Sequence, residues 1–343
     1  MKQSTGIISG DPIVTDSDEL DDTGVEVELR TVSVSVAQHG ARLDRALTDG
    51  VPEFSRNYLQ QLIDAGLVTV NGRLVHKASS RVGAGDTLVI ELRPTPQSQA
   101  FVPQTMPLEV VFQDAHILVI NKPAGLVVHP APGNWSGTLL NGLLALDKGF
   151  ALVPRAGIVH RLDKDTSGLM VVARSRAAMD RLIQAIAARE VSRQYLAVAH
   201  GCWTGPKHKT VDLAIGRDPR NRLRMATVNL QSQSGKSAKT DFVLIGNADA
   251  GCLVQCILHT GRTHQIRVHM ASLGHSLVAD AVYGGHPVEA MQRQALHAFR
   301  LAFTHPLTDE PLAFEMPPPA DFMDLLRDWG LRYNSTSRAE KPL

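Results

Sequence analysis

The sequence predicts an α+β fold in two folded parts, the larger of which contains a mixed, mostly antiparallel sheet. Short apolar runs follow one another at hairpin-like spacing, with helical patterns between them. No GxGxxG or GxxxxGKS/T motif is present, so the sequence does not favour a doubly wound nucleotide-binding fold. A Pro-, Gln- and Ser-rich stretch at 94–99 indicates a linker, which we place at 94–106.

The composition is that of a soluble protein whose charge is unevenly distributed. Of the 343 residues, 43% are hydrophobic and 20% are charged. Residues 1–30 contain eight acidic and two basic residues, although the whole chain has a net charge of +1. We expect this acidic tail and residues 333–343 to be disordered. The basic remainder suits a polyanionic partner such as nucleic acid.

Two features favour a cytoplasmic location. The sequence contains no apolar run of the ~20 residues that span a membrane, and its N-terminus lacks a secretory signal. The three cysteines, Cys202, Cys252 and Cys256, form no CxxC pair, which indicates small core residues in a reducing compartment. We therefore expect a cytoplasmic protein that does not associate with a membrane.

Residues 31–93 have the pattern of a small, separate unit. Alternating valines at 32, 34 and 36 predict a strand, and residues 42–47 predict a helix of one or two turns. A second helix is expected from its N-cap at Ser55 to its stop at Gly66. The dipeptide Asn71-Gly72 predicts a hairpin turn, and a strand at 87–92 closes the unit.

The order of motifs in this unit resembles the S4 RNA-binding domain. The matching motifs are Arg42-Leu43-Asp44, Ser55-Arg56, Val70-Asn71-Gly72 and Gly85-Asp86. The resemblance implies that the two helices lie on structured RNA. It also implies phosphate contacts, which make affinity salt-dependent without reading bases, from Arg42, Arg45, Arg56 and Lys77.

Residues 107–332 form the second predicted domain, in which strands outnumber helices. Helices are expected at 138–145, from a cap at Ser175 to Arg189, after a cap at Thr263, and at 320–329. Strands are expected at 108–112, 117–121, 194–199, 209–214, 223–228, 240–245, 253–258, 295–303 and 312–314.

The stretch 157–173 is the strongest functional signal in the sequence. Between two apolar runs, each of which predicts a buried strand, lie five ionisable side chains: His160, Arg161, Asp163, Lys164 and Asp165. Desolvated charges must be paired, hydrogen-bonded or functional, because burying them is otherwise too costly. Asp163 is therefore the first candidate for chemistry.

The residues alone leave other chemistries to weigh. No HExxH motif or cysteine pair accompanies the four clustered histidines, so we expect no metal at His259, His264, His269 and His275. Ser167 lacks the GxSxG context of an activated nucleophile. Asp163 and Asp165 could act as paired carboxylates in hydrolysis, and at this point that alternative stays open.

The segment 160–169 resembles the HRLDxxTSG signature of the RluA-type pseudouridine synthases. Further motifs follow in the family order: INKP at 120–123, VVHP at 127–130, RQYLA at 193–197, the segment 260–269, and RQALHA at 293–298. They extend the resemblance over residues 31–332. The VHP and PGN motifs at 128–134, with the S4-like unit, are most similar to members that modify large-subunit ribosomal RNA.

This resemblance implies an isomerase that converts uridine in RNA to pseudouridine without a cofactor. It makes Asp163 the essential aspartate, acting as nucleophile or base, and it makes Tyr195 the residue that packs on the target base. It makes Arg267 the partner of the aspartate and Leu296 an apolar wall of the pocket. Arg161 then fills the space left by the flipped nucleotide.

The resemblance also implies a partner, 23S ribosomal RNA in helix 69 or the assembling large subunit, and we expect a monomer. Two alternatives remain: the same reaction on transfer RNA or another ribosomal site, and an RNA-binding assembly factor whose catalysis is secondary or lost. Two regions depart from the resemblance. The connection between Gly285 and Arg293 is short, and the acidic tail lies outside the match.

Overall fold

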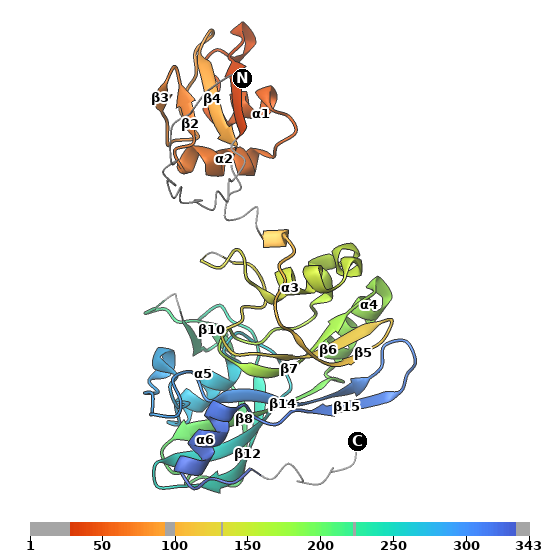
Figure 1. Ribbon diagram of the computed structural model, residues 1–343. Helices are drawn as coiled ribbons and strands as arrows, with labels where there is room; N and C mark the ends of the chain where they lie inside the picture. The colour runs from red at the N-terminus through yellow and green to blue at the C-terminus, as the bar shows by residue number, and fades with distance from the viewer. Residues whose placement is uncertain (1–27, 93–99, 132, 222–223, 334–343) are drawn as a thin grey trace, which may run out of the picture. The chain divides into compact units, whose positions relative to one another are not determined.

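The computed structural model describes residues 28–92, 100–131, 133–221 and 224–333 (Figure 1). The chain divides into two compact units, a smaller N-terminal one and a larger C-terminal one. Both combine helices with sheets rich in antiparallel pairs, which confirms the predicted α+β class. Residues 1–27 and 334–343 of the predicted tails, and 94–99 of the predicted linker, lie outside the described residues. None of the described helices is long and apolar enough to span a bilayer.

The smaller unit packs two helices against a four-stranded antiparallel sheet with the order β1-β4-β2-β3. Its elements are β1 Glu28–Ser33, the 3-10 helix η1 Val36–Gln38, α1 Leu43–Gly50, α2 Arg56–Asp64, β2 Val68–Val70, β3 Arg73–Leu74 and β4 Thr87–Leu92. As predicted, Ser55 caps α2 by accepting a hydrogen bond from the Tyr58 amide. Asn71 and Gly72 have φ of 50° and 77°, which fits the predicted tight hairpin turn.

The first strand begins and ends earlier than the sequence predicts. β1 starts inside the predicted tail because it pairs with β4 along its whole length, from Glu28 opposite Leu92 to Ser33 opposite Thr87. It ends before Val36 because a capping box between residues 35 and 38 starts a 3-10 turn. The predicted disorder of residues 1–30 is therefore wrong for 28–30.

The larger unit is built on a nine-stranded sheet. Eight of its strands follow the order β5-β6-β7-β14-β8-β13-β12-β9, and the ninth, β15, pairs with β14. Its strands are β5 Glu109–Gln113, β6 Ile117–Lys122, β7 Ser167–Ala173, β8 Ser192–His200, β9 His208–Asp212, β12 Lys239–Asn247, β13 Gly251–Leu258, β14 Leu296–Thr304 and β15 Pro311–Glu315. A separate hairpin pairs β10 Ile215–Arg217 with β11 Met225–Thr227. β7 and β14 run parallel, whereas the other paired strands described are antiparallel.

Helices cover both faces of this sheet. α3 Leu139–Leu146 and α5 Gln265–Ser272 share a hydrophobic cluster with Tyr195 and Leu296. α4 Arg176–Ala188 and α6 Ala320–Asp328 pack on the opposite face, against alternate strand residues such as Val171 and Leu196. Because side chains alternate along a strand, neighbours in sequence face different cores. Short 3-10 helices complete the unit: η3 Lys148–Leu152, η4 Pro154–Gly157 and η5 Ala281–Tyr283.

The apolar run before His160 is not the strand that the sequence predicts. The 3-10 helix η4 precedes it, and Ile158 forms only a single bridge, with Val172 of β7. The reason is backbone conformation, since residues 155, 156 and 157 all have positive φ. The chain therefore turns where an extended strand would have to continue. The run after the charged residues is a strand, β7, as predicted.

Two smaller predictions are also wrong. Helix α5 is preceded by His264, which adopts a left-handed conformation with φ of 56°, and not by a cap at Thr263. The Gln265 side chain instead accepts a hydrogen bond from the Arg262 amide at 2.9 Å, so it satisfies the turn that Thr263 was expected to cap. Cys202 is exposed, whereas the other two cysteines are buried as expected.

Gly168 on β7 lies so close to the backbone of β14 that a side chain at this position would clash with it. Its φ is +115°, and a Cβ built there would lie 2.2 Å from the carbonyl oxygen of Ala298. We predict that Gly168→Ala lowers the free energy of unfolding in urea by about 3 kcal/mol, because backbone on both strands must move. Gly274→Ala is the control, since its φ is +84° but its Cβ meets nothing within 4 Å. There we expect only the backbone strain of about 1 kcal/mol; equal losses at both positions would contradict the close approach.

Candidate active site

One cavity of about 630 Å³ in the larger unit brings the predicted catalytic and substrate-binding residues together. The loop before β7 contributes Arg161 and Asp163, β8 contributes Tyr195, β14 contributes Leu296, and α5 contributes Arg267. Among the described residues that line the cavity, Asp163 is the one carboxylate. The geometry assembles this set, and the role of each residue stays a prediction.

Strand register explains why these residues meet. Tyr195 on β8 lies opposite Ala298 on β14, and Leu296 is two residues before Ala298, so it points to the same face. His297 lies opposite Ser167 in the parallel pair of β14 and β7. The loop that precedes Ser167 therefore enters the sheet beside the first residues of β14. Pairing among three strands thus carries the loop aspartate to the tyrosine.

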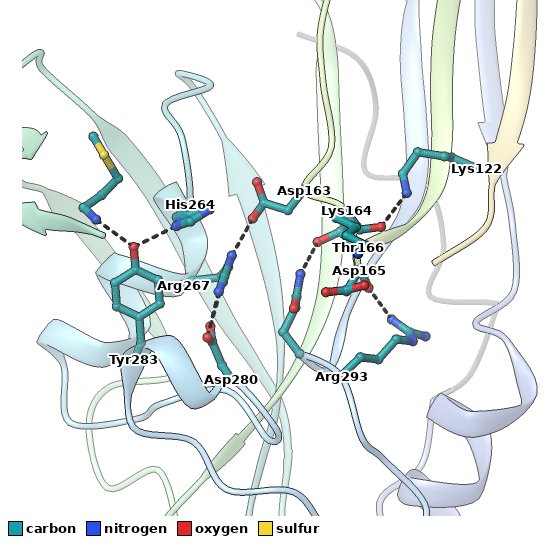
Figure 2. Close-up of polar contacts among 12 residues, drawn as sticks. Lys122, Asp163, Lys164, Asp165, Thr166, His264, Arg267, Asp280, Tyr283 and Arg293 are labelled. Carbon is teal, nitrogen blue, oxygen red and sulfur yellow. Dashed lines mark hydrogen bonds and ion pairs between the residues drawn. The ribbon is translucent and has the colours of Figure 1, made fainter. Parts of the chain in front are cut away.

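A chain of three charged side chains forms the centre of the site. Arg267 donates through Nη1 to Asp163 Oδ2 at 3.2 Å, and through Nε and Nη2 to both carboxylate oxygens of Asp280 at 2.7 and 2.8 Å (Figure 2). The exposed fractions of these side chains are 7% for Arg267, 1% for Asp280 and 17% for Asp163. Asp280 therefore holds the guanidinium from the interior, and Asp163 keeps the more accessible place.

Arg267 is further supported by an aromatic residue. Burial works against the charge of Arg267, but the hydrogen bond and charge of Asp280 and the charge of Asp163 raise its pKa above the ordinary value. The guanidinium carbon lies 5.1 Å from the centre of the Tyr283 ring. The Tyr283 hydroxyl lies 2.8 Å from Nδ1 of His264, and Figure 2 draws this hydrogen bond as a dashed line. Burial lowers the pKa of His264, which favours its neutral ring.

A buried lysine holds the loop that carries Asp163. Lys122, at the end of β6, is fully buried, and its Nζ donates at 2.7, 2.9 and 3.0 Å to the carbonyls of Pro123, Leu126 and Lys164. Burial lowers the pKa of Lys122 to about 7, while the charges of Asp165 and Asp163 oppose this shift. Three carbonyl acceptors match the three N–H donors of an ammonium group. Lys122 therefore ties the turn after β6 to the loop.

Two residues just before β14 hold the same loop. Arg293 donates through Nη1 to the carbonyl of Asp165 at 2.9 Å (Figure 2). Its Nε and Nη2 donate to the carboxylate of Asp321 on α6 at 2.7 and 2.9 Å. Gln294 donates to the Thr166 hydroxyl at 3.3 Å, and the Thr166 amide donates to the Asp163 carbonyl at 3.1 Å. The loop has no regular secondary structure, so these bonds satisfy its backbone and set the direction of Asp163.

The wall of the cavity is strongly positive. Burial raises the pKa of Tyr195 to about 12, so its phenol is neutral at physiological pH. Arg161 is exposed on the loop. Six arginines line the cavity together with the single carboxylate of Asp163: Arg155, Arg161, Arg189, Arg193, Arg262 and Arg267. Such a surface suits an anionic substrate.

The clustered histidines bind other groups of the protein. Their nearest polar partners are, in chain order, Asp241 for His259, Tyr283 for His264, Thr240 for His269 and the carbonyl of His200 for His275. In the part of the chain that the structure describes, no group of three or more His, Cys, Asp or Glu side chains could hold a metal ion.

In the smaller unit, one buried acid organises two of the predicted RNA-binding residues. Asp44 accepts hydrogen bonds from Arg42 Nε at 3.1 Å and from Arg56 Nη2 at 2.8 Å. The hydrogen bond from Arg42 lowers the pKa of Asp44 far below its usual value, although burial opposes this. Arg45 and Lys77 are exposed. The structure therefore brings Arg42 and Arg56 together and leaves Arg45 and Lys77 open to solvent.

Sequence reasoning did not select Asp280, Lys122 or Tyr283. Lys122 could have been selected from the sequence, because it directly follows an apolar run that predicts a buried strand. Burying a charged group there costs free energy unless the group is paired or hydrogen-bonded. No sequence pattern pointed to Asp280, since only the tertiary structure brings it to Arg267, which lies on another element.

A positive cavity with one arginine-bound carboxylate, in a chain that also carries a small α+β unit with grouped arginines, is the arrangement expected of a protein that binds nucleic acid. Residues 116–272 match the family described as RNA pseudouridylate synthase, and residues 42–88 match the S4 domain. Among solved structures, human RNA pseudouridylate synthase domain containing 1 is 30% identical with a TM-score of 0.50, covering 62% of this chain and 84% of that one.

The relatives of this chain include proteins named ribosomal large subunit pseudouridine synthase D. The relative from Neisseria meningitidis serogroup B is 47% identical over 307 residues, which is 86% of this chain and 80% of the relative. The relative from Xylella fastidiosa is 44% identical over 310 residues, with coverage of 87% and 91%. The chain therefore belongs to the RNA pseudouridylate synthase family, and it is an RNA pseudouridine synthase with an S4 domain.

Asp280 tests whether the interior end of the charge chain is needed. We predict that Asp280→Asn lowers the free energy of unfolding by about 3 kcal/mol, because a buried guanidinium loses its main counter-charge. The rate of pseudouridine formation should fall about 10²-fold, because Arg267 no longer positions Asp163. Asp180→Asn, which breaks the exposed pair with Arg176, is the control and should change stability by less than about 0.5 kcal/mol. Matching effects of the two variants would show that Asp280 has no special role.

Proposed function

We propose that this enzyme isomerises uridines to pseudouridine in 23S ribosomal RNA, in helix 69, as the large subunit matures in the cytoplasm. The observation that carries the proposal is Asp163, the one carboxylate in a described cavity wall with six arginines, bound by Arg267. The names of the relatives from Neisseria and Xylella support the large-subunit substrate. We expect the chain to act as a monomer.

The reaction requires the target uridine to leave the RNA helix. Its glycosidic bond and ring cannot be reached or rotated within a stack, so the nucleotide must be flipped into the enzyme. A cavity of about 630 Å³ is large enough for one nucleotide. Tyr195 offers a neutral ring to pack on the base, and Leu296 offers an apolar wall. Arg161, exposed on the loop, is suited to fill the space left in the helix.

Asp163 is the group we assign to the bond changes. The C1′–N1 bond breaks, the uracil rotates, a C1′–C5 bond forms, C5 then loses its proton, and N1 gains one, so that the product is an isomer of the substrate. Charge develops on base and sugar as the first bond breaks, and a carboxylate beside the nucleotide stabilises or captures the electrophilic carbon. Arg267 compensates the charge of this carboxylate before substrate binds. The isomerisation is redox-neutral and needs no energy donor.

The smaller unit supplies a second RNA contact in this proposal. Arg42 and Arg56 are each about half exposed while Asp44 holds them, so their forks are pre-oriented for phosphate oxygens. Arg45 and Lys77 add flexible charges at the same unit. Such contacts position the enzyme on structured RNA and leave the choice of uridine to the cavity.

Replacing Asp163 by Asn separates catalysis from binding. We expect pseudouridine formation in a 23S ribosomal RNA transcript to fall by about 10³-fold or more, because the amide can neither attack nor accept a proton. The dissociation constant for the same transcript should stay unchanged. Asp165→Asn is the matched control, since Asp165 is two residues away but does not line the cavity. If Asp163→Asn retains activity while Asp165→Asn loses it, the assignment of the carboxylate is wrong.

The contribution of the smaller unit is measured by salt dependence. In a variant with both Arg45→Gln and Lys77→Gln, we expect weaker binding of the transcript at low salt. The slope of log Kd against log salt should fall by about 0.9 for each phosphate that the variant no longer neutralises. The control removes two exposed arginines from the helices on the far face of the sheet, Arg181→Gln on α4 and Arg327→Gln on α6. A slope that responds equally to both pairs would argue against a specific RNA contact by this unit.

A further inference from the structure

Arg193 differs from the other arginines of the cavity. It is 6% exposed, and within the described part of the chain its Nε has no hydrogen-bond partner. Arg267, which is equally buried, is bound by two carboxylates. Arg193 lies on β8 two residues before Tyr195, so both side chains point to the same face of the sheet and line the same cavity.

A second unpartnered donor lines the cavity with Arg193. The Nε2 atom of His160 accepts a hydrogen bond from the Val171 amide at 3.1 Å, so the ring proton must sit on Nδ1. Nδ1 is buried and finds no partner among the described residues. Burial and the nearby charge of Arg193 lower the pKa of His160 to about 3, which keeps the ring neutral. The wall therefore offers two buried N–H groups that lack acceptors.

The turn before α5 leaves room for the Arg193 side chain. Gly261 lines the same cavity, and a Cβ built on it would lie 2.8 Å from Nη1 of Arg193. Any larger residue at 261 would therefore push the end of the Arg193 side chain aside. The absence of a side chain there is a condition for the present position of the guanidinium.

A guanidinium does not lose its proton at physiological pH, so burial cannot neutralise Arg193. A buried charge without a counter-charge destabilises a protein, so a ligand of opposite charge would be stabilised at such a group. The planar fork of arginine matches the two free oxygens of a phosphodiester. We propose that Arg193, with the Nδ1–H of His160, binds a backbone phosphate next to the flipped uridine. This inference rests on the proposed function, since it takes RNA as the substrate.

The test neutralises one phosphate at a time. After the modified uridine is mapped with the wild-type enzyme, a helix 69 stem-loop is made with a methylphosphonate at each phosphate flanking it. We expect one substitution to raise KM about tenfold for wild type and to have no further effect on Arg193→Gln. Arg193→Gln itself should raise KM about tenfold on the unmodified RNA and leave kcat within about threefold. Additive losses in KM would overturn the inference.

Three further measurements separate this role from a structural one. Arg193→Gln should not lower the melting temperature of the free enzyme, because it removes an uncompensated buried charge; a clear drop would indicate a structural arginine. Arg193→Lys should restore part of the loss in KM. Gly261→Ala should raise KM in the wild-type background but not in Arg193→Gln. If Gly261→Ala changes KM equally in both backgrounds, it acts independently of Arg193.

The outcome also distinguishes this inference from the proposed function. If the wild-type enzyme forms no pseudouridine in the stem-loop or in a 23S transcript, the proposed function fails, and the phosphate contact is judged from binding alone. Arg193→Gln should then still reduce the slope of log Kd against log salt for the transcript by about 0.7 to 0.9. An unchanged slope would overturn the phosphate contact.

Discussion

The larger unit depends on one electrostatic constraint, a carboxylate that must stay charged inside a cavity. Asp163 is compensated by Arg267, and Arg267, being almost wholly buried, in turn requires Asp280. The three groups come from a loop, from α5 and from the segment after α5. Each ion pair therefore also sets the distance between two elements of the fold. Removing the interior acid, Asp280, is therefore expected to disturb Asp163, because Arg267 contacts both carboxylates.

A second constraint concerns the backbone of the loop that bears Asp163. A loop without regular structure leaves carbonyl groups without the backbone partners that a helix or a strand would supply. Here side-chain cations take over that task, with Lys122 bound to the Lys164 carbonyl and Arg293 bound to the Asp165 carbonyl. The charges of Asp163 and Asp165 also act on Lys122, where they oppose the fall of its pKa. The same two side chains therefore satisfy the backbone of the loop that carries Asp163.

Much of this could be predicted from sequence, and the failures have physical causes. Some predictions that depend only on neighbouring residues were correct, as for the helix cap at Ser55 and the turn at 71–72. The charged stretch indicated Asp163 because the charges and the apolar runs that bury them lie in one segment of the sequence, so the free-energy cost of burying those charges could be inferred there. The apolar run before His160 was misjudged because positive φ at residues 155–157 is not encoded by hydrophobicity. Asp280 was missed because its importance comes wholly from a partner on another element.

The distribution of charge in the cavity also separates affinity from rate. Uridine and pseudouridine carry the same charge, so contacts to phosphates stabilise substrate, transition state and product alike. Such uniform binding lowers KM without raising kcat. In the proposed reaction, a wall arginine that binds only phosphate can therefore hold the RNA but cannot accelerate the isomerisation, whereas Arg267 affects the rate through its ion pair with Asp163. Acceleration must come from groups that meet the base and sugar as charge develops, which leaves Asp163 with Tyr195 and Leu296 around it. A cavity wall with six arginines and one carboxylate fits this separation, in which arginines bind the phosphates of the RNA and Asp163 acts on the base and sugar.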